Sequence, residues 1–211
     1  MTDHPTPDPP RRGRRPRTYA AVLQATSGLL ATTSLADLSV AQILNAADVG
    51  RTSFYEHFAS KDDVVVKLME SLSDEVAREL EPMFERGERS PDEAFRLGLT
   101  NLIDAATRYA SLVVAVSEEW PAIPELRAIW FAMLGDFTAR LARLIEGERA
   151  AGVAPRGADA KALAASLVWT AERSFHVANS GSHPTLRDAS TLVEPLVQLF
   201  VGSIYGRAVE L

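Results

Sequence analysis

The sequence predicts an all-α fold of about nine helices, with an N-terminal three-helix head that contains a helix-turn-helix and a larger C-terminal helical body. Three observations predict this fold. From Thr18 onward, apolar residues recur at spacings of three and four, the period of an amphipathic helix. No stretch shows the strict alternation of a half-buried strand, and no internal repeat occurs. Prolines, glycines and capping serines separate the periodic stretches, as they do at helix boundaries.

Composition and charge narrow the function classes. The 211 residues carry a net charge of −6 and include no cysteine, which excludes disulfides and cysteine-ligated metal. Through Lys61 there are seven basic and five acidic residues, a balance of +2, whereas the remainder has 15 basic and 23 acidic residues, a balance of −8. No apolar run is long enough to span a bilayer, and no apolar signal segment opens the chain. We therefore expect a cytoplasmic protein that meets a polyanion at its N-terminal end.

Residues 1–16 are rich in proline and arginine and almost without apolar side chains, so we expect them to be disordered when free. Two interpretations of this basic arm stay open. It is a solvated tail, or it is attracted to DNA phosphates and to a minor groove. Its position directly before the first helix favours the second interpretation.

The head begins with an amphipathic helix over 18–33. Two short helices over 40–46 and 51–58 follow, joined by a turn at 48–50. Ser39 is a cap for the first of them. Phe54 and Phe58 are four residues apart, so they share one face and pack inward, while Thr52 and Glu56 point outward. A short helix with a polar outer surface and an apolar anchor is typical of the recognition helix of a helix-turn-helix.

The run V-G-R-T-S-F-Y-E-H-F-A-S-K-D-D-V closely resembles the signature of TetR-family transcriptional regulators. The resemblance implies a dimeric DNA-binding protein that recognises a palindromic operator. Carried over position by position, it implies base or phosphate contacts from the start of the recognition helix and phosphate contacts around it. Together with the arginine that directly follows the arm, the DNA-binding candidates are Arg17, Ser39, Gln42, Arg51, Thr52, Ser53, Tyr55, His57 and Lys61.

Two residues depart from the family pattern. Gly50 stands where the family often has a capping serine, so the recognition helix is framed more loosely there. Glu56 is acidic on the outward face, where it accepts from cytosine or disfavours other sites.

A longer helix follows the head. Ser60 and Asp63 form a capping signal at its start, and we expect it to end at 85–87. This helix starts at the DNA and ends inside the body, so it is a natural lever between two sites.

The body pattern predicts further helices over 91–107, 110–118, 125–151, 158–179 and 186–205. The last is apolar nearly all round and needs cover on several sides. Either a second subunit provides that cover or the helix is buried in the monomer. The family resemblance implies that 158–179 and 186–205 pair with their copies in a four-helix homodimer interface.

Three stretches, GERAAGVAPRG, AERSFHVANSG and SIYGR, resemble the ligand-binding half of EthR-type regulators. That resemblance implies a pocket within the body, although aromatic residues at helical spacing are also ordinary core. Val168 and Ala171 occupy positions where EthR-type pockets carry asparagines, and no candidate is charged, so we expect a neutral, apolar effector. The candidate ligand-binding residues are Phe95, Leu99, Leu102, Trp130, Leu134, Phe137, Trp169, Phe175 and Phe200.

The sequence contains none of the catalytic motifs that we searched for. The histidines, at 4, 57, 176 and 183, form no metal-ligand spacing, and neither a Gly-rich phosphate loop nor a G-x-S-x-G elbow occurs. We expect no catalytic residues, no metal and no cofactor.

Two hypotheses result, on a chain divided into the arm (1–16), a helix-turn-helix domain (17–60) and a ligand-binding and dimerisation domain (61–211). The first is a homodimeric repressor that binds a double-stranded DNA operator and is released by a small hydrophobic effector. The alternative is a dimeric small-molecule-binding protein with weak or non-specific DNA binding.

Overall fold

The computed structural model describes residues 14–186 and 188–206, and within them all regular structure is helical, which confirms the predicted all-α fold. None of the described helices is both long and apolar enough to cross a membrane. In chain order the elements are α1 (Arg14–Leu29), α2 (Val40–Ala47), α3 (Arg51–Tyr55), α4 (Lys61–Glu79), α5 (Glu81–Phe84), α6 (Pro91–Arg108), α7 (Ala110–Glu119), α8 (Pro124–Ala150), α9 (Ala160–Ser180), the 3-10 helix η1 (Ala189–Leu192) and α10 (Val193–Tyr205).

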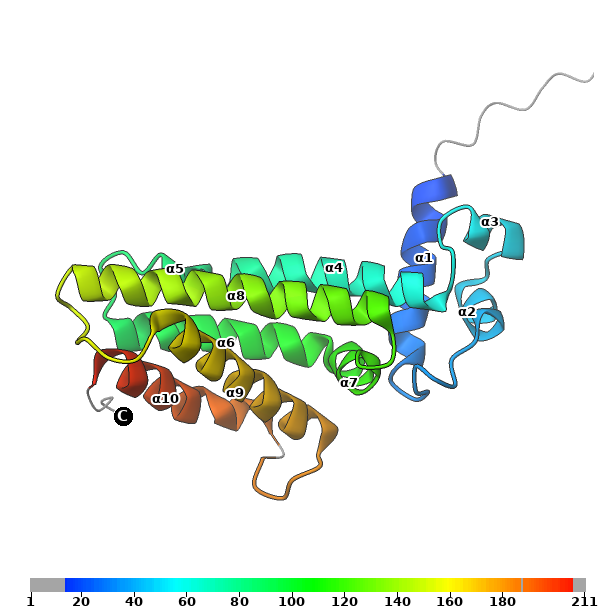
Figure 1. Ribbon diagram of the computed structural model, residues 1–211. Helices are drawn as coiled ribbons and strands as arrows, with labels where there is room; N and C mark the ends of the chain where they lie inside the picture. The colour runs from blue at the N-terminus through cyan, green and yellow to red at the C-terminus, as the bar shows by residue number, and fades with distance from the viewer. Residues whose placement is uncertain (1–13, 187, 207–211) are drawn as a thin grey trace, which may run out of the picture.

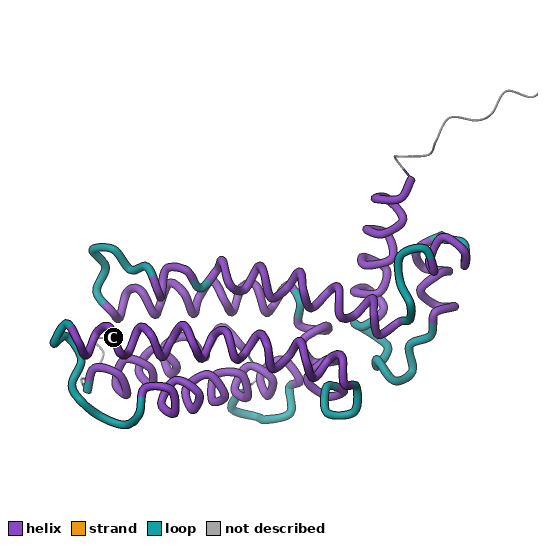
Figure 2. Tube along the Cα trace, turned by 45° about the horizontal axis from the view of Figure 1, so that its top comes forward, coloured by secondary structure: helices purple, strands orange, loops and turns teal. Residues whose placement is uncertain are grey.

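A small head lies at one end of a long helical body (Figure 1). Helices α1, α2 and α3 form the head, and α4 begins beside them and continues into the body. Helix α4 packs against α1 in the head and against α6, α7 and α8 in the body. The pairs α8–α9 and α6–α10 complete the body, which Figure 2 shows as a bundle of elongated helices. One helix therefore belongs to both parts of the molecule.

Aromatic residues anchor the head. Phe54 and Phe58 are buried, with ring centroids 5.5 Å apart. Tyr19 of α1 stacks on Phe58 at 5.0 Å. Helix α3 ends at Tyr55, earlier than predicted, but the amide of Phe58 still donates to the carbonyl of Phe54 at 3.0 Å. The chain thus keeps a helical path long enough to turn both phenylalanines inward.

Side-chain caps set the starts of several helices. The Ser39 hydroxyl accepts from the amide of Gln42, and the Gln42 side chain accepts from the amide of Ser39, which makes a capping box. Each such bond satisfies a backbone N–H that has no partner within the helix. The residues whose side chains cap α2, α4, α6 and α9 are Ser39, Ser60, Ser90 and Asp159.

The first helix differs from the prediction at both ends. It begins at Arg14 rather than Thr18 and ends at Leu29 rather than Thr33. Pro16 lies in its first turn, where a missing N–H breaks no intrahelical bond. Residues 14–16 of the predicted arm are therefore helical, and residues 1–13 lie outside the described residues.

Two predicted helices are divided by proline. The helix expected from Ser60 to 85–87 ends at Glu79, and the short α5 follows. Pro82 has no N–H to continue the ladder, so the helix breaks just before it. The helix expected over 186–205 becomes η1 and α10, with Pro195 in the first turn of α10.

Helix α10 packs most of its apolar residues inside its own chain. Five of them, Leu196, Val197, Phe200, Val201 and Ile204, are buried, whereas Leu199 is 37% exposed. Burial within the monomer therefore accounts for most of the apolar character of this helix. The dimer interface implied by the resemblance stays a prediction that rests on the outer residues alone.

Candidate DNA interface and internal cavity

The turn between α2 and α3 depends on Asp48. This residue has a left-handed backbone (φ 52°), which aspartate tolerates better than most side chains. The next amide, of Val49, donates to the carbonyl of Leu44 at 3.1 Å and closes the end of α2. Gly50 then starts α3 without a side-chain cap, as its sequence predicted. Its φ of −70° suits any residue, and no described atom lies within 4 Å of where a Cβ would stand, so a serine would fit.

The outer surface of α3 presents a cation beside an aromatic ring. Arg51, Thr52 and Tyr55 are exposed, with Tyr55 at 46%, and Ser53 is half-buried. The guanidinium carbon of Arg51 lies 5.7 Å from the centroid of the Tyr55 ring. That ring and the Phe54 ring meet edge to face, with centroids 5.2 Å apart. The Arg51 guanidinium, which can donate two hydrogen bonds to guanine, therefore lies next to the Tyr55 ring, whose flat face suits a sugar or a thymine methyl group.

Four more predicted DNA-binding residues surround α3. Arg17 is exposed on α1, and Ser39 and Gln42 are exposed at the start of α2. Because the Gln42 oxygen accepts from Ser39, the Gln42 amide nitrogen keeps its donors for a partner outside the chain. His57 is half-buried, edge-on to Tyr19 at 6.0 Å.

Lys61 is engaged inside the head. Its ammonium group donates to the carbonyl oxygens of Leu35 at 2.7 Å, Ala36 at 3.1 Å and Leu38 at 2.8 Å. An ammonium has three donors, so these bonds occupy all of them. A phosphate contact by this group would cost one of the bonds. In this arrangement Lys61 ties the first turn of α4 to the loop between α1 and α2.

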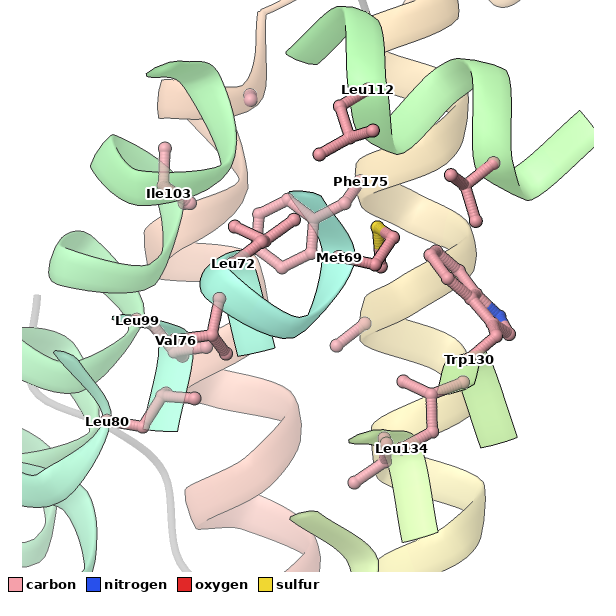
Figure 3. Packing of buried hydrophobic residues seen from close by; sticks show 14 of the residues in the cluster. Met69, Leu72, Val76, Leu80, Leu99, Ile103, Leu112, Trp130, Leu134 and Phe175 are labelled. Carbon is pink, nitrogen blue, oxygen red and sulfur yellow. The ribbon is translucent and has the colours of Figure 1, made fainter. Parts of the chain in front are cut away.

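The body contains a partly open apolar cavity of about 100 Å³. Figure 3 shows Leu72 and Val76 of α4 facing Phe175 and, from the opposite wall, Trp130 and Leu134. The lining residues are Leu72, Val76, Met83, Leu99, Leu102, Ala106, Val113, Trp130, Met133, Leu134, Phe137, Val168, Ala171, Glu172, Phe175 and Phe200.

One acidic side chain lies on this wall. Glu172 is 9% exposed, and neither of its carboxylate oxygens has a hydrogen-bond partner among the described residues. The nearest basic group, Arg173, approaches only to 3.6 Å, and its side chain is 53% exposed. Burial therefore raises the pKa of Glu172 above its ordinary value, although Arg173 opposes the shift.

The two parts of the chain match two family models. The model for the N-terminal part of bacterial regulatory proteins of the TetR family covers residues 22–68. The model for the C-terminal domain of the transcriptional regulator EthR covers residues 95–206, more than half of the chain. The chain belongs to the TetR family. It is a DNA-binding transcriptional regulator of EthR-like type.

Similar proteins agree with this assignment. The HTH-type transcriptional regulator EthR of Mycolicibacterium smegmatis is 29% identical over 93% of this chain and 91% of its own. The transcriptional regulator AcuR of Cereibacter sphaeroides is 30% identical over 78% of this chain and 81% of its own. Among solved structures, FadR from Bacillus subtilis in complex with stearoyl-CoA shares the fold, with a TM-score of 0.72 and 17% identity over 88% of this chain and 99% of its own.

This TetR-family body brings most of the predicted pocket residues together. Phe95 and Trp169 are the two that lie outside the cavity wall. Phe95 packs on Phe200 at 5.7 Å between centroids, and Trp169 contacts Phe131 at 5.7 Å on the outer side of α8 and α9. The predicted residues that line the cavity are Leu99, Leu102, Trp130, Leu134, Phe137, Phe175 and Phe200.

Sequence reasoning missed the α4 contribution and the acidic residue. The expectation of a wall without charged residues is wrong, because Glu172 lies on it. A signal for it existed: Val168, Ala171, Glu172 and Phe175 are spaced as i, i+3, i+4 and i+7, so the glutamate interrupts an apolar stripe. For Leu72 and Val76 the sequence showed only that they lie on the apolar side of a long helix. This did not distinguish residues that line a cavity from residues that pack in the core.

Proposed function

We propose that the protein is a repressor that binds a palindromic operator as a homodimer and leaves it when a small apolar molecule enters the cavity. The course of α4 carries the proposal. Its first residue, Lys61, is bonded to the head, and Leu72 and Val76 on the same helix line the cavity. The eleven steps along the helix from Lys61 to Leu72 span about 17 Å, so a rigid rod connects the two sites.

The size of the cavity supports release by displacement. Ligand sites usually measure about 300–1,000 Å³, whereas this cavity measures about 100 Å³. A typical effector therefore enters only if the wall moves, and α4 is part of the wall. Helix α4 is also bonded to α8, because Arg140 of α8 donates to the carbonyl of Ala77 at 3.2 Å. An effector releases the operator only if it binds the displaced state more tightly, because equal affinity for both states shifts nothing.

The outer face of α9 and α10 supports dimer formation. Several side chains exposed on these helices are short or apolar, with Lys161, Arg173 and Gln198 exposed beside them, and short side chains allow helices to approach closely. Two heads of such a dimer would reach successive major grooves, about 34–36 Å apart. The residues of this face are Ala162, Ser166, Thr170, Leu199 and Ser203.

Selection from random duplex DNA with the purified full-length protein, at about physiological salt, tests the proposal. We expect enrichment of an inverted repeat with half-sites one helical turn apart. Arg51→Ala should relax specificity at one position of each half-site. A well-folded protein that enriches no sequence, or only an unrepeated one, would contradict the proposal as stated.

A further inference from the structure

A buried carboxyl group without a hydrogen-bond donor among the described residues indicates what kind of molecule the cavity accepts. Glu172 projects from α9 into the apolar wall, 9% exposed, and both of its oxygens lack a donor within the described chain. Burying such a group without a hydrogen-bond donor costs free energy, and leucine at this position would continue the apolar stripe of α9 at no such cost. A ligand that supplies the missing donor gives this residue a function.

The surroundings of Glu172 decide which donor fits. Arg173 forms a long ion pair with Glu172, at 3.6 Å, which is beyond hydrogen-bond distance, and the Arg173 side chain is 53% exposed. The indole nitrogen of Trp130 is a second polar atom of the wall without a partner, but it is a donor and lies on the side of its ring away from Phe175 (Figure 3). Within the described wall, Glu172 is therefore the residue that, once ionised, provides a charged hydrogen-bond acceptor.

We propose that Glu172 selects effectors that carry a protonated amine at one end of an apolar body. This inference rests on the proposed role of the cavity as the effector site. An ammonium group supplies up to three donors to two vacant oxygens and cancels a charge that the wall cannot solvate. A hydroxyl group supplies one donor and leaves the charge. A carboxylate of the same length would bring a like charge to Glu172 and be rejected.

Calorimetry with three probes of equal chain length, 1-octylamine, 1-octanol and octanoate, tests the inference on the full-length protein without DNA. We expect the amine to bind about 10-fold to 100-fold more tightly than the alcohol, the range of one charge-assisted hydrogen bond, and octanoate to bind most weakly. Quenching of Trp130 fluorescence, absent in Trp130→Phe, would show that the probe occupies the cavity.

Two variants assign the preference to one residue. Glu172→Gln should bind amine and alcohol about equally, and Glu172→Leu should bind the alcohol more tightly than the wild type does. Glu146→Gln, which removes an exposed acid from α8, should keep the amine preference. This control matters because the net charge of −6 attracts cations in general.

The outcomes separate the two proposals. Equal affinity of the wild type for amine and alcohol would overturn the amine inference and leave the cavity as an effector site. An amine preference that survives in Glu172→Gln would overturn it as well. Binding of none of the three probes would count against the cavity as a ligand site and against this inference with it.

Discussion

The DNA-facing surface and the cavity wall are built in opposite ways. The first is the outer side of one short helix, Arg51–Tyr55, whose shape depends on residues within one or two helical turns of each other. The wall is buried and takes side chains from helices between Leu72 and Phe200. A surface set by local spacing carries a sequence signature, whereas a wall assembled from distant helices carries only apolar periodicity. The comparison teaches that a candidate DNA-facing surface can be predicted from a motif here, whereas the chemistry of an effector cannot.

The largest expected effect comes from removing an anchor of the local surface. Phe54→Ala should lower the free energy of unfolding by about 3–5 kcal/mol, because Phe54 is fully buried and alanine leaves a cavity. Urea denaturation followed by circular dichroism measures the change. Leu97→Ala, at a partly exposed position of α6, should cost far less. Equal losses in the two variants would show that α3 is not anchored through Phe54.

One residue further, the same kind of truncation should affect binding and not folding. Tyr55→Ala removes an exposed ring, so stability should change by less than about 0.5 kcal/mol. Operator affinity should fall by about 30-fold or more, the loss expected of a contact worth about 2 kcal/mol. Binding to labelled operator and gel filtration, to check the dimer, measure both. Retained operator binding would contradict the placement of α3 in the groove.

These two neighbouring positions also show what the sequence predicts well. The four-residue spacing of Phe54 and Phe58 predicted an inward face and therefore an outward one, and the helices of the body followed from the same period. The break between α4 and α5 at Pro82 was also encoded locally, but apolar periodicity on both sides of it predicted one continuous helix.

Contacts between distant segments were not predictable in this way. The motif placed Lys61 at the DNA, but its three carbonyl partners lie 23 to 26 residues away in the chain, in a loop whose path the sequence does not specify. The lack of a hydrogen-bond donor for Glu172 depends on side chains from helices that lie far from it in the sequence. Both residues are polar. The spacing of apolar residues predicts which side of a helix is buried, but it does not predict which groups a polar side chain will meet.

Lys61 sharpens the comparison, since it belongs to the local motif but makes distant bonds. Lys61→Met should lower the free energy of unfolding by about 1–3 kcal/mol, because three carbonyl oxygens lose their donor. The slope of log affinity against log salt should stay nearly unchanged, whereas loss of a phosphate contact would reduce it by about 0.9. Denaturation and operator titration at several salt concentrations measure the two quantities.

Lys67→Met provides the control for Lys61, because the Lys67 ammonium pairs with exposed Glu70, one turn further along α4. It should change stability little. If Lys61→Met keeps its stability and loses salt dependence, the ammonium serves phosphates and the motif-based role is the right one.

On the cavity side, Phe137→Ala should weaken effector binding by about 10-fold and alter operator affinity much less, because the ring lines the cavity and contacts Phe84 edge-on at 5.7 Å. Phe95→Ala is the matched control, since Phe95 is buried but lies outside the wall. It should cost stability without changing effector affinity. The opposite ranking of the two variants would mean that Phe137 only packs.

The smallest effect is the pH dependence of stability that Glu172 introduces. Burial raises its pKa above the ordinary 4.5, so the folded protein keeps this proton over a pH range in which the unfolded chain has lost it. The free energy of unfolding therefore falls as pH rises through that range, by about 1.4 kcal/mol for each unit of pKa difference. Below pH 4.5 the penalty is absent, and above the folded-state pKa it is complete.

Glu172→Gln isolates this contribution because glutamine does not titrate. Glu75 and Glu194, whose pKa values their arginine partners lower, give the opposite slope, but they do so in both proteins and cancel in the difference. Denaturation of wild type and variant between about pH 4 and pH 8 should show a gap that opens with rising pH in favour of the variant. Parallel curves would mean that water reaches the carboxylate, and the wall would then lack the dry environment that makes an ammonium partner necessary.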